Sequence, residues 1–430
     1  MRKMKNSGVE WIGEIPVEWE VTTIKKAYSF QTGWTPDTKN EDNFIGDNVW
    51  VNISDMDSKI IFESNKHISD DAVNVSSMNI SPKGSLLYSF KLSVGNVAFC
   101  GVDLYTNEAI ATFLEGENSL KYLYYIAPVF IIKNANENIY GAKLLNQSLI
   151  RNAKIVLPPL SEQHRIADFL DEKCAKIDAV IEKQKQVIEK LKEYKLSVIT
   201  EAVTKGLDPT VPMKDSGVEW IGDIPESWKI GKIKSAVLKV GSGKTPKGGS
   251  EIYSDEGVLF IRSQNVYDEG LKLDNSTYIS SDIDNEMSNT RVYGNDVLLN
   301  ITGGSIGRTC IYPKGMPSAN VNQHVCIIRT KENVIKPEYM HYFWMSFCGK
   351  TSIDIYQTGA NREGLNFEQI NNTKIPYMGL REQEEIITYL DHQCDTINLA
   401  IAKKQTIIAK LTEYKKSLIY EVVTGKREVL

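Results

Sequence analysis

Residues 241–245 have the composition of a phosphate-binding loop. They read Gly-Ser-Gly-Lys-Thr, and a P-loop ends in Gly-Lys-Thr because the lysine and the hydroxyl hold phosphates and their magnesium ion. The motif also requires a glycine five positions before Gly243, where this chain has Leu238. A related segment, Thr32-Gly33-Trp34-Thr35-Pro36, carries Trp34 in place of the lysine. We therefore interpret both segments as copies of one turn, and not as nucleotide sites.

No other residue pattern predicts catalysis. An amino-methyltransferase needs an Asn/Asp-Pro-Pro-aromatic loop, whereas the Pro-Pro pair here, Pro158-Pro159, leads into a helix pattern. The five histidines form no cluster, and Asp, Glu and Lys form no nuclease-like group that repeats. The six cysteines have no zinc spacing, which is typical of reduced thiols in a cytoplasmic protein. We expect no catalytic residues, no metal and no cofactor.

The chain contains an internal repeat with similar ends and different middles. Residues 4–16 (MKNSGVEWIGEIP) return 209 residues later as 213–225 (MKDSGVEWIGDIP). A second block, Leu-x-Glu-Gln at 160–163, returns 220 residues later at 380–383. The second middle is therefore longer by 11 residues. Similar ends with different middles indicate one scaffold that carries two different surfaces.

The end of each half predicts a long helix with a coiled-coil seam. Apolar residues recur in two parallel seven-residue steps over about four heptads, which is typical of helices that pair. The seam positions are Leu170, Cys174, Ile177, Ile181, Gln184, Ile188, Leu191, Lys195, Val198 and Ala202 in the first helix, and Leu390, Cys394, Ile397, Ile401, Lys404, Ile408, Leu411, Lys415, Leu418 and Val422 in the second. We expect the two helices to pair antiparallel.

The polar seam positions have two interpretations. Gln184 matches Lys404, and Lys195 matches Lys415. Either the seam is loosened and solvated there, or the polar residues reduce stability but fix register and partner.

The middles, about 20–155 and 229–375, predict mixed α/β domains. Short β-rich runs such as 258–261, 297–299 and 325–328 are separated by Gly, Asn and Asp turns. One helix is expected in each half, at 120–126 and 338–344. Both are rich in aromatic residues that could stack on a ligand, but their helical spacing favours core packing. The repeated segments 4–16 and 213–225 are called the heads. Trp11 and Trp220, which lie in the heads, are expected to pack each domain onto the helices.

Composition sets broad limits. The chain has 430 residues, of which 42% are hydrophobic, and a formal net charge of −5. This is ordinary globular composition. The negative charge argues against a stand-alone basic nucleic-acid binder, but not against binding through local basic loops. No apolar run is long enough for a signal peptide or a membrane span, so we expect a cytoplasmic protein.

These features together resemble the DNA-specificity subunits of Type I restriction–modification enzymes. The resemblance rests on the two heads, the Gly-x-Thr-Pro turns, the Leu-x-Glu-Gln helix starts and the twin helices. It implies two target-recognition domains that each read half of a split site in double-stranded DNA, and helical spacers that bind two methyltransferase subunits. Restriction and motor subunits are further partners, and methylation and cleavage reside in the partners, so the chain itself is expected not to be an enzyme.

The resemblance and the repeat give an expected organisation. The fold class is α+β, with two mixed α/β domains joined by two antiparallel coiled-coil helices around a pseudo-two-fold. We expect target-recognition domains at 1–157 and 209–377 and spacer helices at 158–208 and 378–430.

DNA contacts are expected from polar and basic side chains on loops, because Lys and Arg neutralise phosphates while Arg, Asn and Gln read base edges. The candidates in the first half are Thr35, Asn52, Ser54, Lys91, Ser93, Asn96 and Lys143. Those in the second half are Lys244, Thr245, Lys247, Arg262, Gln264, Asn265, Ser305, Arg308, Asn361 and Arg362. The first half has fewer basic candidates, so its base contacts are less well defined by sequence.

Two other functions compete with this one. A coiled-coil scaffold without a DNA role would show no salt-dependent DNA binding in its complex. A self-contained enzyme would show turnover that is lost when Lys244 is replaced.

Overall fold

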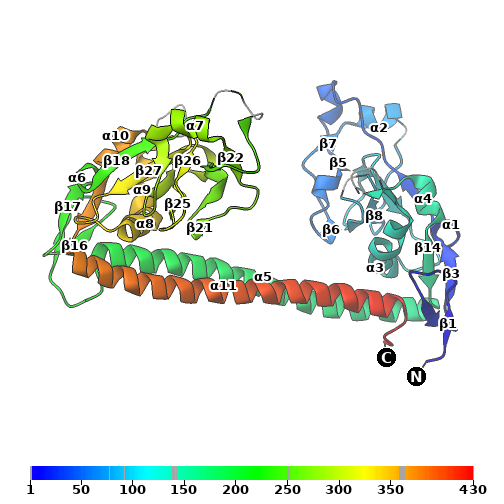
Figure 1. The fold of residues 1–430 in the computed structure, drawn as a ribbon. Helices are drawn as coiled ribbons and strands as arrows, with labels where there is room; N and C mark the ends of the chain where they lie inside the picture. Colours follow the sequence, from blue (N-terminus) through cyan, green and yellow to red (C-terminus); the bar gives the residue numbers. More distant parts are fainter. Residues whose placement is uncertain are drawn as a thin grey trace. The chain divides into compact units, whose positions relative to one another are not determined.

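The computed structural model describes residues 2–76, 78–91, 93–137, 141, 143–246, 248, 252–357 and 364–429. The chain divides into two compact units. Unit 1 comprises Met1–Lys183 and Thr406–Leu430, and unit 2 comprises Gln184–Gln405. Two long helices, α5 (Leu160–Lys205) and α11 (Leu380–Val423), contribute residues to both units (Figure 1).

Unit 1 is built on two sheets. A five-stranded sheet has the order β4-β11-β8-β9-β6 and a three-stranded sheet the order β10-β5-β7. Their bounds are β4 Phe30–Thr32, β11 Ile110–Phe113, β8 Leu86–Ser89, β9 Val97–Cys100, β6 Ile60–Ile61, β10 Tyr105–Thr106, β5 Asn48–Val51 and β7 His67–Ile68. Smaller elements are β1 Met4–Asn6, β2 Glu14–Pro16, β3 Glu20–Thr23, β12 Asn136–Glu137, β13 Lys143–Leu144, β14 Lys154–Leu157, α1 Ile24–Ala27, α2 Asp70–Ser76, α3 Leu120–Phe130, α4 Gln147–Asn152, η1 Glu41–Phe44, η2 Ile53–Asp55 and η3 Ile131–Asn134.

Unit 2 repeats this plan with two four-stranded sheets. Their orders are β18-β27-β24-β25 and β22-β19-β26-β23. Their bounds are β18 Val237–Ser242, β27 Val325–Thr330, β24 Val297–Asn300, β25 Thr309–Ile311, β22 Thr277–Ile279, β19 Val258–Ile261, β26 Ala319–Val321 and β23 Arg291–Val292. The other elements are β15 Met213–Asp215, β16 Asp223–Pro225, β17 Lys229–Lys232, β20 Val266–Tyr267, β21 Gly270–Leu271, β28 Lys374–Tyr377, α6 Ile233–Ala236, α7 Ser281–Glu286, α8 Pro337–Met345, α9 Phe347–Gln357, α10 Phe367–Asn372, η5 Ser263–Asn265, η6 Ser288–Thr290 and η7 Gly303–Ser305.

The strands expected from short β-rich runs at 258–261, 297–299 and 325–328 are present as β19, β24 and β27. The expectation of one helix in each half is wrong for both halves. The helices α3 and α8 lie where they were expected, but the first half also contains α1, α2 and α4, and in the second half α8 is followed at once by α9. Ser346 breaks the helix between them, and its hydroxyl accepts the backbone N–H of Gly349 at 3.2 Å. Gly349 then lies so close to the backbone of Phe343 that a side chain there would collide with it.

The long helices pair antiparallel within each unit. In unit 1 Leu418 and Val422 of α11 share a core with Ile166 and Leu170 of α5. In unit 2 Val198 and Ala202 of α5 share a core with Ile386 and Leu390 of α11. All twenty seam positions named above are buried or half-buried, whereas the residues on the opposite side of each helix are exposed. Burial of one stripe is the arrangement that a heptad pattern requires.

Two of the three seam lysines, Lys415 and Lys195, bond across to the other helix at matching places. In unit 1 Lys415 pairs with the Asp178 carboxylate at 2.6 Å. In unit 2 the corresponding Lys195 donates to the side-chain oxygen of Asn398 at 3.0 Å. These two contacts favour the interpretation that the lysines fix the register of the pair, whereas the side-chain oxygen of Gln184, another polar seam residue, is buried without a hydrogen-bond partner.

A hydrogen bond between a repeated Trp and a repeated Glu joins each head to the start of a long helix. In unit 1 the Trp19 indole N–H donates to Glu162 at 2.9 Å. In unit 2 Trp228 donates to Glu382 at the same distance. Glu162 also receives the guanidinium of Arg2 through two hydrogen bonds. Burial alone raises the pKa of Glu162, but the hydrogen bonds from Arg2 and Trp19 outweigh it, so the pKa of this carboxyl lies below its usual value.

The repeated Gln residues hold the aromatic helix of each domain. Gln163 accepts the backbone N–H of Ser119, which caps α3, at 3.0 Å. Gln383 accepts the backbone N–H of Lys336, which caps α8, at 2.9 Å. The Leu-x-Glu-Gln repeat therefore joins three parts of each domain at one point: the head, the aromatic helix and the long helix.

The aromatic stripe belongs to the core, as its spacing favours. Tyr122 and Tyr339 are fully buried, and each donates its hydroxyl to a backbone carbonyl. Tyr125 donates to Asp171, and Tyr342 donates to Asp391 at 2.6 Å, so both bind the nearby long helix. Trp11 also reaches that scaffold, since its carbonyl accepts the Tyr420 hydroxyl of α11 at 3.1 Å. Among the described residues, no helix has both the length and the apolar character needed to cross a membrane.

Candidate nucleic-acid interface

The Gly-x-Thr-Pro turn of unit 1 is pressed against the end of β10. A side chain on Gly33 would place its Cβ 1.7 Å from the carbonyl oxygen of Thr106, so only glycine fits. The next residue, Trp34, donates its backbone N–H to the same carbonyl at 2.9 Å. Thr35 then donates its hydroxyl to the Glu108 carboxylate. Three successive residues are therefore fixed by the segment 106–108.

Unit 2 has a similar arrangement in which both the backbone hydrogen bond and the partner of the threonine differ. A Cβ on Gly243 would lie 1.5 Å from the carbonyl oxygen of Val321. The backbone N–H of Gly243 bonds to Asn322 at 3.2 Å, and the Thr245 hydroxyl bonds to Gln323. The likeness of residues 241–245 to a P-loop thus comes from a turn that follows strand β18 and docks on the end of β26.

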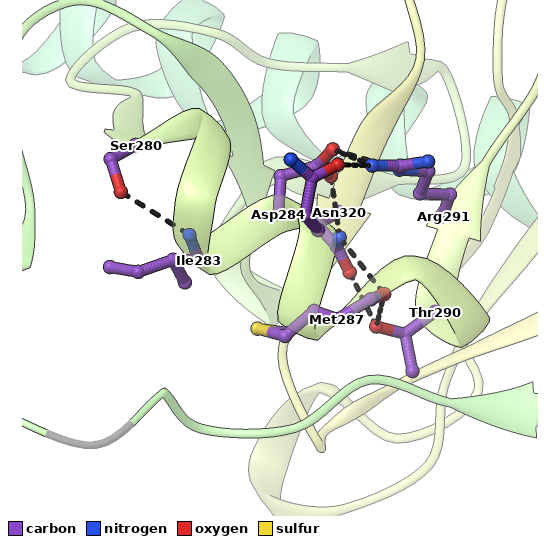
Figure 2. Close-up of polar contacts among 8 residues, drawn as sticks. Ser280, Ile283, Asp284, Met287, Thr290, Arg291 and Asn320 are labelled. Atoms are coloured by element: carbon purple, nitrogen blue, oxygen red, sulfur yellow. Dashed lines mark hydrogen bonds and ion pairs between the residues drawn. The ribbon is translucent and has the colours of Figure 1, made fainter.

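The strand β26 that receives this turn is held by a buried polar network. Asn320, fully buried, donates to Asp284 of α7 at 2.8 Å and accepts the Thr290 hydroxyl (Figure 2). Asp284 in turn receives the Arg291 guanidinium at 2.8 Å. Figure 2 shows these side chains converging between α7 and the strand. Because buried and satisfied networks fix one geometry, the segment 321–323 has a rigid base.

A short 3-10 turn follows β5 in unit 1 and β19 in unit 2. In unit 1 the Asn52 side chain accepts the backbone N–H of Ser54 at 2.8 Å, and Asp55 bonds back to the Asn52 backbone at 2.9 Å. In unit 2 Asn265 takes the place of Asp55 and bonds to the Arg262 backbone at 2.9 Å. Equivalent turns therefore present Asn52 in one unit and Arg262 in the other.

Asn265 has a structural position that the sequence did not reveal. It is 2% exposed, and its amide group also donates to the Lys272 carbonyl at 2.9 Å. Both ends of this buried side chain bond to backbone groups, one in its own turn and one at Lys272, so Asn265 is not a candidate for DNA contact.

A third loop follows β8 in unit 1 and β24 in unit 2. Ser93 adopts a positive φ of 45°, and its carbonyl accepts the Ser89 hydroxyl at 2.5 Å. In unit 2 the Asn300 amide donates to the Ser305 hydroxyl at 3.1 Å. Arg308 packs its guanidinium 4.8 Å above the Tyr267 ring.

Four of the predicted residues of the first half surround one surface pocket. Its volume is about 530 Å³, and it is lined by Asn52, Ile53, Ser54, Lys91, Ser93, Asn107, Glu108 and Ala109. Thr35 and Lys91 both bond to Glu108, Lys91 at 3.3 Å. The hydrogen bond from Thr35 is the main cause that lowers the pKa of Glu108, and Lys91 adds to it. The loops thus present a charged carboxylate beside amide, hydroxyl and ammonium groups.

Glu108 and Gln323 were missed by sequence reasoning. Each follows an asparagine directly after the strand that receives the turn, in Asn107-Glu108 and Asn322-Gln323. That shared pair was the signal that could have identified them.

The remaining candidates are more scattered. Lys143 lies on β13 and pairs with Glu137, and it does not line the pocket. Lys244, Gln264 and Asn96 are exposed. Lys247, Asn361 and Arg362 lie outside the described residues. A larger pocket of about 1030 Å³, between α5 and the sheet edge of unit 1, is lined by none of the predicted residues.

Comparisons with known proteins agree with the repeat. The family model described as Type I restriction modification DNA specificity domain matches residues 16–190 and 225–412. The chain is 26% identical over 446 residues to a putative type I restriction enzyme MjaX specificity subunit of Methanocaldococcus jannaschii, covering 97% of this chain and 96% of that protein. It is 25% identical to the type I restriction enzyme EcoBI specificity subunit of Escherichia coli, covering 76% and 74%.

A solved structure shares the fold. A chain from a structural study of complex assembly and conformational transition in a type I restriction–modification system superposes with a TM-score of 0.72 at 15% identity. The match covers 96% of this chain and 99% of that one.

Proposed function

The chain belongs to the family of Type I restriction–modification DNA-specificity proteins, and from this premise we propose that it reads an asymmetric, bipartite site in double-stranded DNA. Each unit would read one half-site. The chain would recruit two methyltransferase subunits, and restriction and motor subunits would join them in the cytoplasm. Methylation and cleavage would be carried out by these partners, so we assign no catalytic residue to this chain.

The carrying observation is that equivalent turns on one repeated scaffold present different side chains. Trp34 corresponds to Lys244, Asn52 to Arg262 and Glu108 to Gln323. In contrast, the contacts that hold the scaffold are the same in both units, namely Trp to Glu and Gln to the helix cap. A fixed frame with different exposed groups suits a protein that reads two different sequences with one geometry.

The proposed contacts are the exposed and half-exposed members of these loops. They are Thr35, Asn52, Ser54, Lys91 and Ser93 in unit 1 and Lys244, Thr245, Arg262, Gln264, Ser305 and Arg308 in unit 2. Lys143, Lys247, Asn361 and Arg362 remain sequence-based candidates. Arginine forms bidentate bonds to guanine, so Arg262 would favour guanine, whereas the corresponding Asn52 uses its side-chain oxygen to cap its own turn and could offer only its amide N–H groups.

The test is methylation mapping in a host that lacks other Type I systems. The chain is co-expressed with its neighbouring methyltransferase gene, and methylated adenines are located genome-wide. We expect a motif of two short segments separated by a fixed spacer. A continuous motif, or no methylation beyond that given by the methyltransferase alone, would exclude the proposal.

A chimera sharpens this test. Replacing residues 20–155 by those of a relative should change one half-site and leave the other half-site unchanged. A matched chimera of residues 229–375 should have the converse effect. A change in both half-sites from either chimera would contradict the assignment of one half-site to each unit.

A further inference from the structure

Trp34 differs from every other tryptophan in the chain. Trp19, Trp50, Trp228 and Trp344 are buried, and Trp11 and Trp220 are partly buried in the domain cores. Trp34 is 56% exposed. An exposed indole loses the hydrophobic stabilisation that the other six contribute to folding, so its position calls for a role outside the fold.

The exposure of Trp34 does not come from a loose loop. Its backbone N–H bonds to Thr106 at 2.9 Å, and its carbonyl accepts the indole N–H of Trp50 at 3.0 Å. Gly33 and Thr35 on either side are fixed by Thr106 and Glu108. The side chain therefore projects from a backbone that is held on both sides. An aromatic group held in this way loses little entropy when it binds a partner.

The surroundings of Trp34 indicate what that partner is. The adjacent Thr35 connects through Glu108 to Lys91, which lines the polar pocket together with Asn52 and Ser54. The same position of the unit 2 turn carries the exposed Lys244. If both turns contact the same class of ligand, that ligand must accept an aromatic face at Trp34 and an ammonium group at Lys244. Double-stranded DNA offers deoxyriboses and thymine methyl groups for the first and phosphates for the second.

We propose that the Trp34 indole is a DNA contact of unit 1, packing its face against a deoxyribose or a thymine methyl group of the half-site that this unit reads. The proposal rests on the DNA-reading function proposed above. It gives the two units chemically different anchors on equivalent turns, an apolar one in unit 1 and a cationic one in unit 2.

The salt dependence of binding separates these two kinds of contact. A lysine on a phosphate releases counterions, so its removal lowers the slope of log K against log salt concentration by about one. An aromatic contact releases none, so its removal weakens binding equally at all salt concentrations. Packing the exposed indole against such an apolar group removes hydrophobic surface from water, so we expect its loss to reduce affinity by about 10-fold.

The experiment uses the full chain assembled with its methyltransferase subunits. The probe is a duplex oligonucleotide that carries the site found by methylation mapping, and Kd is measured from about 50 to 300 mM NaCl. We expect Trp34→Ala to weaken binding about 10-fold with an unchanged salt slope, and Trp34→Phe to retain most of the affinity. Lys244→Ala is the matched control in unit 2 and should lower the slope by about one.

The outcomes separate the inference from the function on which it rests. Wild-type affinity for Trp34→Ala, or a loss accompanied by a changed salt slope, overturns the role of Trp34 while the split motif still stands. An unchanged melting temperature of Trp34→Ala shows that the loss is in binding and not in folding. If the wild-type complex gives no split motif and no specific binding, the proposed function fails first.

Discussion

The two units share their internal contacts and differ in what they expose. In both, a Trp–Glu bond joins the head to a long helix, and a tyrosine binds an aspartate on that helix. The loops that follow the sheets differ, with an exposed tryptophan in unit 1 where unit 2 has a lysine. The comparison shows that the two units share the contacts that join the head, the aromatic helix and the long helix, and differ in several side chains of the loops that follow the sheets.

The strongest test of the shared frame is to add a methyl group to the turn glycines. Gly33→Ala and Gly243→Ala would each force a Cβ into a carbonyl oxygen less than 2 Å away. We expect each variant to destabilise its own unit by about 3 kcal/mol, the upper range for overpacking, and to weaken DNA binding. Calorimetry of the full chain measures the first effect.

Gly116→Ala and Gly379→Ala are matched controls, because no atom lies within 4 Å of the added Cβ. If the turn variants were as stable as these controls, the turns would not be held as described.

A second test concerns an asymmetry within the frame. Glu162 binds both Arg2 and Trp19, whereas the corresponding Glu382 binds Trp228. A glutamine still accepts the indole N–H but leaves Arg2 without its nearly buried partner charge. We expect Glu162→Gln to destabilise unit 1 by about 2 kcal/mol, and Glu382→Gln to cost less than about 1 kcal/mol in unit 2. Equal losses would show that Arg2 adds nothing to the unit 1 contact.

The same residue gives an acid dependence with a defined sign. Since folding lowers the pKa of Glu162, its contribution is complete above the ordinary carboxyl pKa near 4.5 and is lost as the pH falls through the folded value. Acidification from pH 7 to pH 4 should therefore narrow the difference in stability between wild type and Glu162→Gln.

The smallest expected effect is at the helix seam. Asn398→Asp would give Lys195 the ion pair that Lys415 has with Asp178. We expect a gain of about 0.5 kcal/mol, because such partly exposed pairs contribute little. The reciprocal Asp178→Asn should lose a similar amount, and both effects should shrink in 1 M NaCl. A loss of stability in Asn398→Asp would show that the neutral partner is required there.

The scaffold shared by the two units was predictable because its sequence features occur twice in the chain. The repeated heads, the Leu-x-Glu-Gln blocks and the heptad steps predicted two mixed α/β domains with paired helices, and the family resemblance is confirmed. The helix α9 was not predicted, because nothing in the first half corresponds to it and its start depends on a local break at Ser346.

The interface was predictable by residue type more than by position. Asn52, Ser54, Lys91 and Ser93 were chosen because they are polar residues on expected loops. All four line one pocket. The partner of Thr35 could not be found in this way, because Glu108 lies 73 residues away and meets it through sheet topology. Asn265 was chosen for its polarity, but its side-chain amide already bonds to backbone groups of Arg262 and Lys272, which are close in sequence. The sequence identifies the polar side chains, but only the folded structure shows which of them already have hydrogen-bond partners within the protein.

Unit 1 is assembled from the two ends of the chain, whereas unit 2 is continuous. Leu418, Val422 and Val423 complete the core that begins with Ile12 and Trp19. During synthesis, every residue of unit 2 therefore leaves the ribosome before the last part of unit 1 does. Until α11 has been synthesised, the apolar side chains of Leu170 and Cys174 lack the partners that cover them in the folded unit. The core of unit 1 is therefore completed only after unit 2 has been synthesised.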